Sequence, residues 1–247
     1  MKAVILAAGV GKRLMTVSQG CPKCLVEIGK RSLLDRYLAN LADFGIKQVT
    51  LVVGYKHEVI RSVYGGQAYG VALEYLVNEH FERGSIGSLW VASHVMDSDT
   101  VIMDADVLFH PRILHRVVYS SHPTVLAMDE TVVQQGEECM VVAKKGRVVA
   151  LTKRVTMSYD QIGEGVGFLK VHARHLPQLK KVVGKCISRG ELDSEYEDAL
   201  QEFFALVPVG YETIGGLPWT EIDFPEDVVR AEQEILPKLA MTFNGRI

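Results

Sequence analysis

One stretch near the start of the chain, Ala3 to Leu25, constrains the fold more than any other part of the sequence. It begins with an apolar run and continues into a loop of small residues at positions 7–11, which predicts a buried strand that ends in a turn. Lys12 and Arg13 follow the loop directly, and Lys23 comes shortly afterwards. Small side chains leave the loop backbone open to a ligand, and successive backbone N–H groups bind anions. The stretch therefore predicts an α/β fold with a phosphate site where its first strand ends.

The same stretch resembles the signature of the nucleotidyltransferases that act on sugar-1-phosphates and related phosphomonoesters. The family pattern is L-A-A-G-x-G-x-R-L followed by P-K-x-L, and the matching positions are Leu6, Ala7, Ala8, Gly9, Gly11, Arg13, Leu14, Pro22, Lys23 and Leu25. The resemblance implies that Arg13 and Lys23 are catalytic. It also implies a nucleotide-binding loop made of Leu6, Ala7, Ala8, Gly9, Gly11 and Lys12. The alternative is an ordinary turn with basic residues at the surface, which a match over so many positions disfavours.

Composition limits the class of protein. With 247 residues, of which 48% are hydrophobic, the chain is long enough for one large domain with a packed core, or for one domain with a small appendage. A net charge of −3 argues against nucleic acid or an anionic membrane as partner. Apolar runs are shorter than the roughly 20 residues of a membrane span, so we expect a cytoplasmic protein with reduced thiols. Cys21 and Cys24 have the spacing of a metal or redox pair, but chance is favoured because the sequence has no second such pair.

Apolar and amphipathic segments alternate through the first half of the chain. We expect strands over residues 2–6, 48–53, 72–77 and 100–103, and helices over 32–44, 57–64, 86–96 and 111–120. Ser32 is expected to cap the first of these helices, and Gly45 to end it. The alternation predicts a mainly parallel sheet with helices on both faces.

In the second half of the chain, the expected strands no longer alternate regularly with helices. Strands are expected over 124–129, 138–144, 147–152, 163–172 and 219–223, and helices over 173–185, 194–206 and 225–236. The strands on either side of Lys145 and Gly146 are expected to form a hairpin. Because no Pro/Gly/Ser-rich linker divides the chain, we expect a single domain with a nucleotide-binding half over 1–122 and an acceptor-binding half over 123–247. The expected fold class is a three-layer αβα, Rossmann-like nucleotidyltransferase fold with a mainly parallel mixed sheet and a small β-rich acceptor lobe.

Acidic residues follow two of the expected strands. The strand at 100–103 leads into Asp104 and Asp106, and a later extended segment carries Glu221 and Asp223. Mg²⁺ is typically held by one or two carboxylates together with phosphate oxygens. The resemblance implies that Asp106 and Asp223, at strand ends on the same sheet edge, hold a Mg²⁺ cofactor. The alternative role of each is to cap the turn or helix that follows.

The segment after the expected strand at 72–77 resembles the N-x-x-S-L element with which the family reads the base. Asn78, Ser85 and Ser88 are therefore expected to bind the nucleotide. Hydroxyl groups beside a helix N-terminus can hydrogen-bond the edge of a pyrimidine. For Ser88, capping of the helix is an equally good interpretation.

Two segments of the second half resemble the acceptor side of the family, the glycine-rich strand Gly163 to Phe168 and the acidic turn Glu195 to Asp198. The residues expected to bind the acceptor are Lys153, Glu164, Tyr196, Glu197, Asp198 and Trp219. Carboxylates here suit an ammonium or a hydroxyl-rich group. Aromatic rings can hold a quaternary ammonium, and the candidates are Tyr159, Tyr196, Trp90 and Trp219. Packing and capping explain the same residues equally well.

The reaction implied by the resemblance is nucleotidyl transfer from an NTP to a small phosphomonoester or phosphonate, with release of pyrophosphate. The Asp-Ala-Asp strand end and the Ser-x-x-Ser-Leu element resemble the CTP-using branch, which activates choline, inositol or aminoethylphosphonate. A sugar-1-phosphate uridylyl- or guanylyltransferase is the alternative within the fold. A regulatory subunit that binds nucleotide without turnover is disfavoured, because Arg13, Lys23, Asp106 and Asp223 are all present. The oligomeric state stays open, a homodimer included.

Overall fold

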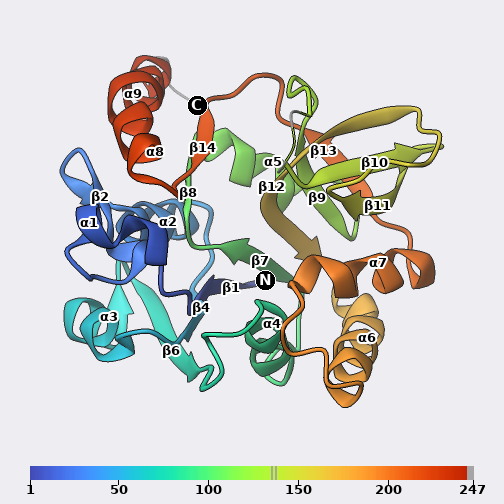
Figure 1. Ribbon diagram of the computed structural model, residues 1–247, viewed down its shortest axis with the longest axis horizontal. Helices are drawn as coiled ribbons and strands as arrows, with labels where there is room; N and C mark the ends of the chain where they lie inside the picture. The colour runs from blue at the N-terminus through green and yellow to red at the C-terminus, as the bar shows by residue number, and fades with distance from the viewer. Residues whose placement is uncertain (135, 137, 244–247) are drawn as a thin grey trace.

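The N-terminal strand lies in the middle of the central sheet in the computed structural model, which describes residues 1–134, 136 and 138–243 (Figure 1). β1 (Lys2–Ala7) pairs in parallel with β4 (Gln48–Val53) on one side and with β7 (Thr100–Asp104) on the other. Beyond β4, the parallel strand β6 (Val71–Val77) is followed by the short antiparallel strand β5 (Gln67–Ala68). The carboxyl ends of four parallel strands therefore meet at one edge, as the sequence predicted.

β12 (Gln161–Val171) connects this parallel part to the strands of the second half. Its last residues pair antiparallel with β7, and its first residues pair antiparallel with β10 (Met140–Lys144). The expected hairpin is confirmed, because β10 pairs with β11 (Arg147–Thr152). β9 (Val125–Asp129) also pairs with β12 and carries β13 (Gly210–Thr213) on its other side. The β-rich lobe is thus an extension of the same sheet, antiparallel except for the parallel pairing of β13 with β9.

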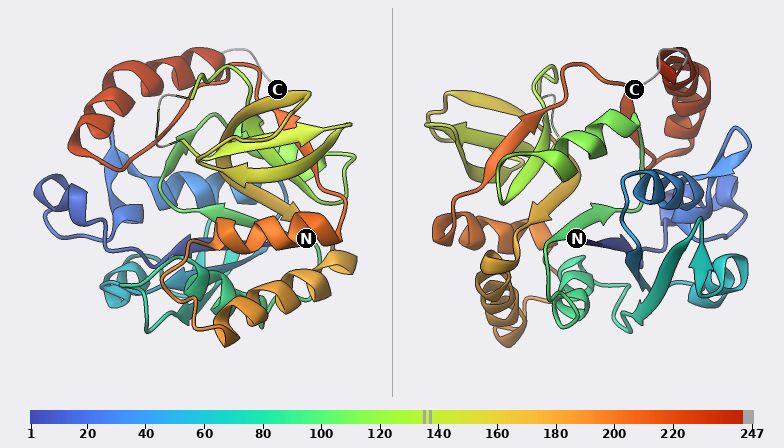
Figure 2. Two further views of the ribbon diagram at one scale, coloured as in Figure 1. Left: turned by 45° about the vertical axis from the view of Figure 1, so that its right-hand side comes forward. Right: turned by 180° about the vertical axis from the view of Figure 1, so that it is seen from behind.

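Helices cover both faces of the sheet, which confirms the expected three-layer αβα class (Figure 2). Side chains of β1 alternate between two buried clusters, with Ala3 and Ile5 in one and Val4 in the other. The first cluster is shared with α2 (Leu33–Asp43), α3 (His57–Tyr64) and α5 (Pro111–Tyr119). The second is shared with α4 (Ile86–Ser93), α6 (Leu176–Ser188) and α7 (Tyr196–Leu206).

The sequence signals at the start of α2 act as predicted. The Ser32 hydroxyl accepts a hydrogen bond from the Asp35 N–H at 3.1 Å, and Gly45 follows the helix with a positive φ of 76°. The buried side chains of α2 recur at helical spacing, and they are Leu33, Leu34, Tyr37, Leu38 and Leu41.

Several short elements carry too few residues for a periodic pattern, and the sequence did not predict them. They are η1 (Lys12–Leu14), α1 (Met15–Ser18), η2 (Lys23–Leu25), β2 (Glu27–Ile28), β3 (Arg31–Ser32), β5, β8 (Val107–Phe109) and β13. The helix expected over 173–185 starts with η3 (Ala173–His175) and continues as α6. The last predicted helix, over 225–236, is observed as α8 (Pro225–Arg230) and a π-helical turn η4 (Ala231–Ile235), and the chain continues as helix beyond the predicted end in α9 (Leu236–Phe243).

Two further expectations concern the thiols and the membrane. Cys21 is exposed and Cys24 is buried, and both are free thiols. Among the helices that the structure describes, none combines the length and the apolar character needed to cross a bilayer.

Candidate active site

A short antiparallel pairing brings two distant acidic residues together. β8 pairs with β14 (Trp219–Glu221), and Val107 lies opposite Glu221. The Ile222 N–H continues this pairing, because it donates to the Asp106 carbonyl at 2.9 Å. Asp106 and Asp223 consequently emerge at the same end of a two-stranded sheet that is separate from the central one. The expectation that a single sheet edge brings them together therefore needs correction, although their proximity was expected.

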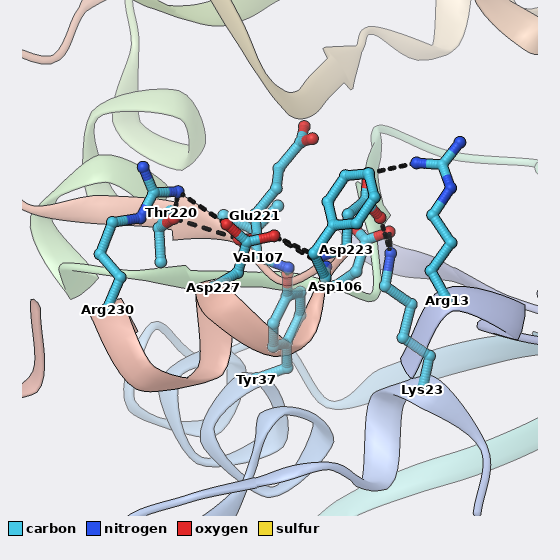
Figure 3. A network of polar contacts seen from close by, with 11 residues as sticks. Arg13, Lys23, Tyr37, Asp106, Val107, Thr220, Glu221, Asp223, Asp227 and Arg230 are labelled. Carbon is cyan, nitrogen blue, oxygen red and sulfur yellow. Dashed lines mark hydrogen bonds and ion pairs between the residues drawn. The ribbon is translucent and has the colours of Figure 1, made fainter. Parts of the chain in front are cut away.

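The Lys23 ammonium lies between these two carboxylates (Figure 3). Its Nζ donates to Asp106 Oδ2 at 2.7 Å and also to Asp223 Oδ1. Burial by itself would lower the pKa of Lys23, but the two carboxylates more than offset this effect and raise the pKa above its ordinary value. Lys23 is therefore a firmly charged cation at a point where its short 3-10 turn meets β8 and β14.

The small-residue loop after β1 runs beside Lys23. Gly11 has a φ of +62°, and a Cβ at this position would lie 3.2 Å from Lys23 Cβ, so the position favours glycine on two counts. A Cβ added at Gly9 would meet no atom of the described residues within 4 Å, because this side of the loop faces open space. The Ala8 carbonyl accepts from the Tyr55 N–H at 3.1 Å, which ties the loop to the end of β4. The loop thus presents a fixed and accessible backbone.

Arg13 approaches the same cluster from the solvent side. Its Nη1 lies 3.8 Å from Asp223 Oδ2, and its guanidinium stacks over the Phe224 ring at 4.8 Å from the centroid. The Arg13 side chain remains 58% exposed, whereas the Lys23 side chain is only 15% exposed. The site therefore combines one buried cation with one accessible cation, and both border the glycine loop.

These residues line one open cavity of roughly 1810 Å³, with walls from both halves of the chain. The first-half site residues on its surface are Leu6, Ala7, Ala8, Gly9, Gly11, Lys12, Arg13, Lys23, Ser85, Ser88 and Asp106. Those of the second half are Lys153, Glu164, Tyr196, Glu197, Asp198, Trp219 and Asp223. The structure thus brings together residues that the sequence assigned to nucleotide, metal and acceptor.

Asn78 takes a supporting position rather than a place on the cavity surface. Its side chain is buried, and Nδ2 donates to Ser88 Oγ at 3.0 Å. Its Oδ1 accepts from the His80 N–H at 3.0 Å. Asn78 therefore fixes Ser88 and the turn after β6, and its contact with nucleotide stays a prediction.

Carboxylates dominate the part of the cavity formed by the second half. Burial, together with the charges of Glu138 and Asp129, raises the pKa of Glu164 to about 7. Burial also raises the pKa of Glu197 to about 7. Glu197 Oε2 is buried and finds no hydrogen-bond partner within the part of the chain that the structure describes. Buried acceptors of this kind favour a ligand that brings hydrogen-bond donors or positive charge.

Asp129 is a cavity residue that sequence reasoning missed. Its Oδ2 accepts from the Trp219 indole Nε1 at 2.7 Å, and its Oδ1 accepts from the Thr131 N–H at 2.9 Å. Asp129 therefore orients the Trp219 ring at the cavity surface. The available signal was an acid at the end of an apolar strand, the same signal that drew attention to Asp104.

The four aromatic rings considered for a quaternary ammonium are not assembled at one point. Trp219 and Tyr196 line the cavity. Trp90 packs instead against His94, with ring centroids 4.4 Å apart, and Gly184 lies beside it. Tyr159 is 49% exposed and does not line the described cavity. The idea of a cage that includes Trp90 and Tyr159 is therefore corrected.

The chain matches known proteins over most of its length. It is 27% identical over 247 residues to the CMP-5'-(3-aminopropyl)phosphonate synthase of Streptomyces rubellomurinus, a match that covers 96% of this chain but only 39% of that protein. It is also 27% identical over 240 residues to the D-glycero-alpha-D-manno-heptose 1-phosphate guanylyltransferase of Aneurinibacillus thermoaerophilus, covering 95% of this chain and 98% of the relative.

A solved structure shares the fold of this chain, and a family model matches its first half. The inositol-1-phosphate CTP transferase of T. maritima has a TM-score of 0.78 at 22% identity, covering 99% of this chain and 96% of that chain, which shows a common fold. Residues 2–131 match the family model described as nucleotidyl transferase. This match spans the glycine loop, Lys23 and Asp106, and it covers more than half of the sequence. The chain therefore belongs to the nucleotidyl transferase family.

Proposed function

We propose that this chain transfers the cytidylyl group of CTP to a small phosphomonoester or phosphonate and releases pyrophosphate. The observation that carries this proposal is the single cavity in which an open glycine loop, two cations and two facing carboxylates meet an acid-rich second half. The phosphonate synthase relative supports it, because its product name joins CMP to an aminoalkyl phosphonate.

The proposed reaction needs no nucleophile from the protein. An oxygen of the acceptor phosphate or phosphonate attacks the α-phosphorus of the NTP, and the bond from this phosphorus to the β-bridging oxygen breaks. Pyrophosphate leaves with the electron pair. The chain positions the two substrates and neutralises the charge of the phosphates through Lys23 and Arg13, the terms that dominate phosphoryl-transfer catalysis.

The residues present fit Mg²⁺ as the cofactor of this reaction. Asp106 and Asp223 already hold a cation between them, the ammonium of Lys23. The described residues contain no group of three or more His, Cys, Asp or Glu side chains arranged for a metal, and Mg²⁺ commonly uses one or two carboxylates plus substrate phosphates. Asp106 and Asp223 would hold the ion, which when bound neutralises phosphate charge. The negative charges of these two acids help to raise the pKa of the neighbouring Glu221 to about 8.

The second half of the cavity suits the non-phosphate end of the acceptor. Glu164 and Glu197 offer carboxylates to an ammonium or to hydroxyl groups, and Trp219 offers an apolar ring held by Asp129. Lys153 provides a cation on the same cavity for the acceptor phosphate. We therefore expect an acceptor with a phosphate or phosphonate at one end and hydrogen-bond donors at the other.

A guanylyltransferase that acts on a sugar-1-phosphate is the second candidate. The guanylyltransferase relative favours it, because the chain covers nearly that whole protein at the same identity. The two candidates differ in the nucleotide and in the acceptor, so one experiment separates them.

The test is a pyrophosphate-release screen of CTP, UTP, GTP and ATP against a panel of acceptors. The panel contains aminoalkyl phosphonates, phosphocholine, inositol-1-phosphate and several sugar-1-phosphates. The highest kcat/KM is expected with CTP and a non-sugar acceptor, with CTP preferred over UTP by roughly 10–100-fold. A higher kcat/KM with GTP and a sugar-1-phosphate contradicts the proposal and supports the second candidate.

A further inference from the structure

Two segments about 110 residues apart in sequence lie against each other beside the cavity. The Gly84 N–H donates to the Leu192 carbonyl at 2.9 Å, and the Ile86 N–H donates to the Ser194 carbonyl at 3.3 Å. A Cβ added at Gly84 would lie 2.0 Å from the Ser194 carbonyl oxygen. The backbones therefore approach as closely as they do because position 84 is a glycine.

Side chains reinforce the same junction. The Arg83 guanidinium makes two parallel hydrogen bonds to the Asp193 carboxylate, at 2.8 and 2.7 Å. Ser85 Oγ accepts from the Tyr196 N–H at 2.8 Å, and the Ser85 N–H donates to the Glu195 carboxylate at 3.2 Å. Tyr196 is the first residue of α7, so Ser85 supplies an acceptor to one of the free N–H groups at the start of that helix. The hydroxyl expected to read the base is thus engaged with the second half of the chain.

The first turn of α7 carries two cavity residues. The Tyr196 side chain is almost fully buried, and its hydroxyl donates to Asp104 Oδ2 at 2.7 Å. Glu197 follows directly and lines the same cavity, and its Oε2 is buried without a hydrogen-bond partner among the described residues. Ser85, Tyr196 and Asp104 therefore form a connected series from the start of α4 to the end of β7.

We propose that Ser85 is a positioning residue for the acceptor, because it fixes the first turn of α7 and with it Tyr196 and Glu197. This inference rests on the proposed function, and it departs from the expectation that Ser85 reads the base. Loss of the Ser85 hydroxyl leaves the Tyr196 N–H without its acceptor and loosens the turn that carries Glu197. The glycine loop, Arg13 and Lys23 contact none of these groups through the hydrogen bonds found among the described residues.

The test compares Michaelis constants for the two substrates in Ser85→Ala. We expect the KM for the acceptor to rise about fivefold, the effect of losing one helix-cap contact, while the KM for the nucleotide changes less than twofold. Ser85→Thr keeps the hydroxyl and should restore most of the acceptor affinity. Glu202→Gln is the matched control, because it removes the α6–α7 contacts to Lys185 and Arg189 away from the cavity and should leave both constants unchanged.

A second readout needs no substrate. Amide hydrogen exchange in the first turn of α7 should become faster in Ser85→Ala than in the native chain and should stay unchanged in Glu202→Gln. A KM increase for the nucleotide alone, or an equal increase for both substrates, overturns the inference, as does unchanged exchange in the α7 turn. If Ser85→Ala does not fold, Asp193→Asn weakens the same junction at an exposed pair, and its acceptor KM should rise by a smaller factor.

The two proposals fail in distinguishable ways. Absence of turnover by the native chain with every nucleotide and acceptor in the screen would sink the proposed function. The exchange measurement would still decide whether Ser85 holds the start of α7.

Discussion

At the scale of single residues, Lys23 is the nearly buried cation of the cavity, and its ammonium lies between Asp106 and Asp223. Lys23→Ala should lower kcat/KM by roughly 10²–10⁴, because it removes a cation aimed at the phosphates of the proposed reaction. The measurement is steady-state kinetics with CTP and the best acceptor. Lys56→Ala is the control, because its ammonium contacts the Gly20 carbonyl on the surface. A folded Lys23→Ala variant with a nearly native rate would contradict the catalytic role.

Glu197 makes a separate prediction about pH. Its folded pKa of about 7 lies above the ordinary glutamate value of 4.5, so the folded chain keeps a proton that the unfolded chain has lost. The contribution of Glu197 to the free energy of unfolding therefore falls as the pH rises from about 4.5 to about 7, and then stays constant.

Glu197→Gln removes this titration and mimics the protonated acid. We expect the variant to be more stable than the native chain by about 1–3 kcal/mol at pH 8 and equally stable near pH 4.5. Urea denaturation at both pH values measures the difference. Glu164 and Glu221 also titrate in this range, so the informative quantity is the difference in free energy of unfolding between the variant and the native chain at each pH. An equal difference at both pH values would count against the prediction.

At the level of elements, helix α8 holds the turn that carries Asp223. Asp227 Oδ2 accepts from the N–H groups of Asp223 and Phe224, at 2.9 and 2.8 Å, and Asp227 Oδ1 accepts from Arg230 at 3.2 Å (Figure 3). Asp227→Ala should lower the free energy of unfolding by about 1 kcal/mol and should raise the Mg²⁺ concentration needed for half-maximal rate. Glu226→Ala, on the same helix turn, is the control. An unchanged Mg²⁺ requirement would show that Asp223 keeps its place without this cap.

The longer elements were predictable from sequence because each repeats its pattern several times. The strands at β1, β4 and β7 and helix α2 follow from apolar periodicity and from the Ser32 cap. The pairing of β8 with β14 was not predictable, since strands of three residues carry no usable period.

Some features of the candidate site were likewise predictable from sequence, and others were not. The loop residues and Lys23 follow from a contiguous motif, so their place on one cavity could be foreseen. The contacts of Asn78 and Ser85 could not, because they depend on tertiary packing against α4 and α7. The contact of Asp129 with Trp219 could not be foreseen either, because the two residues lie 90 positions apart in the sequence.

For the molecule as a whole, β12 makes the two halves depend on one another. Residues 168–171 of β12 complete the pairing of β7, which otherwise has β1 on one side only. We therefore expect a fragment of residues 1–122 to lack cooperative thermal unfolding, and the intact chain to unfold in one transition, as measured by calorimetry. A fragment that melts cooperatively by itself would divide the chain into two domains and contradict the single-domain prediction.

β12 also determines when the sheet can close during synthesis on the ribosome. β7 is translated well before β12, so one edge of β7 stays unpaired until residues 161–171 have emerged. Until then, Val101, Ile102 and Met103 lie on an open, apolar strand edge of the kind that recruits other chains. The nascent chain is thus most exposed to aggregation after its glycine loop has been made and before its sheet can close.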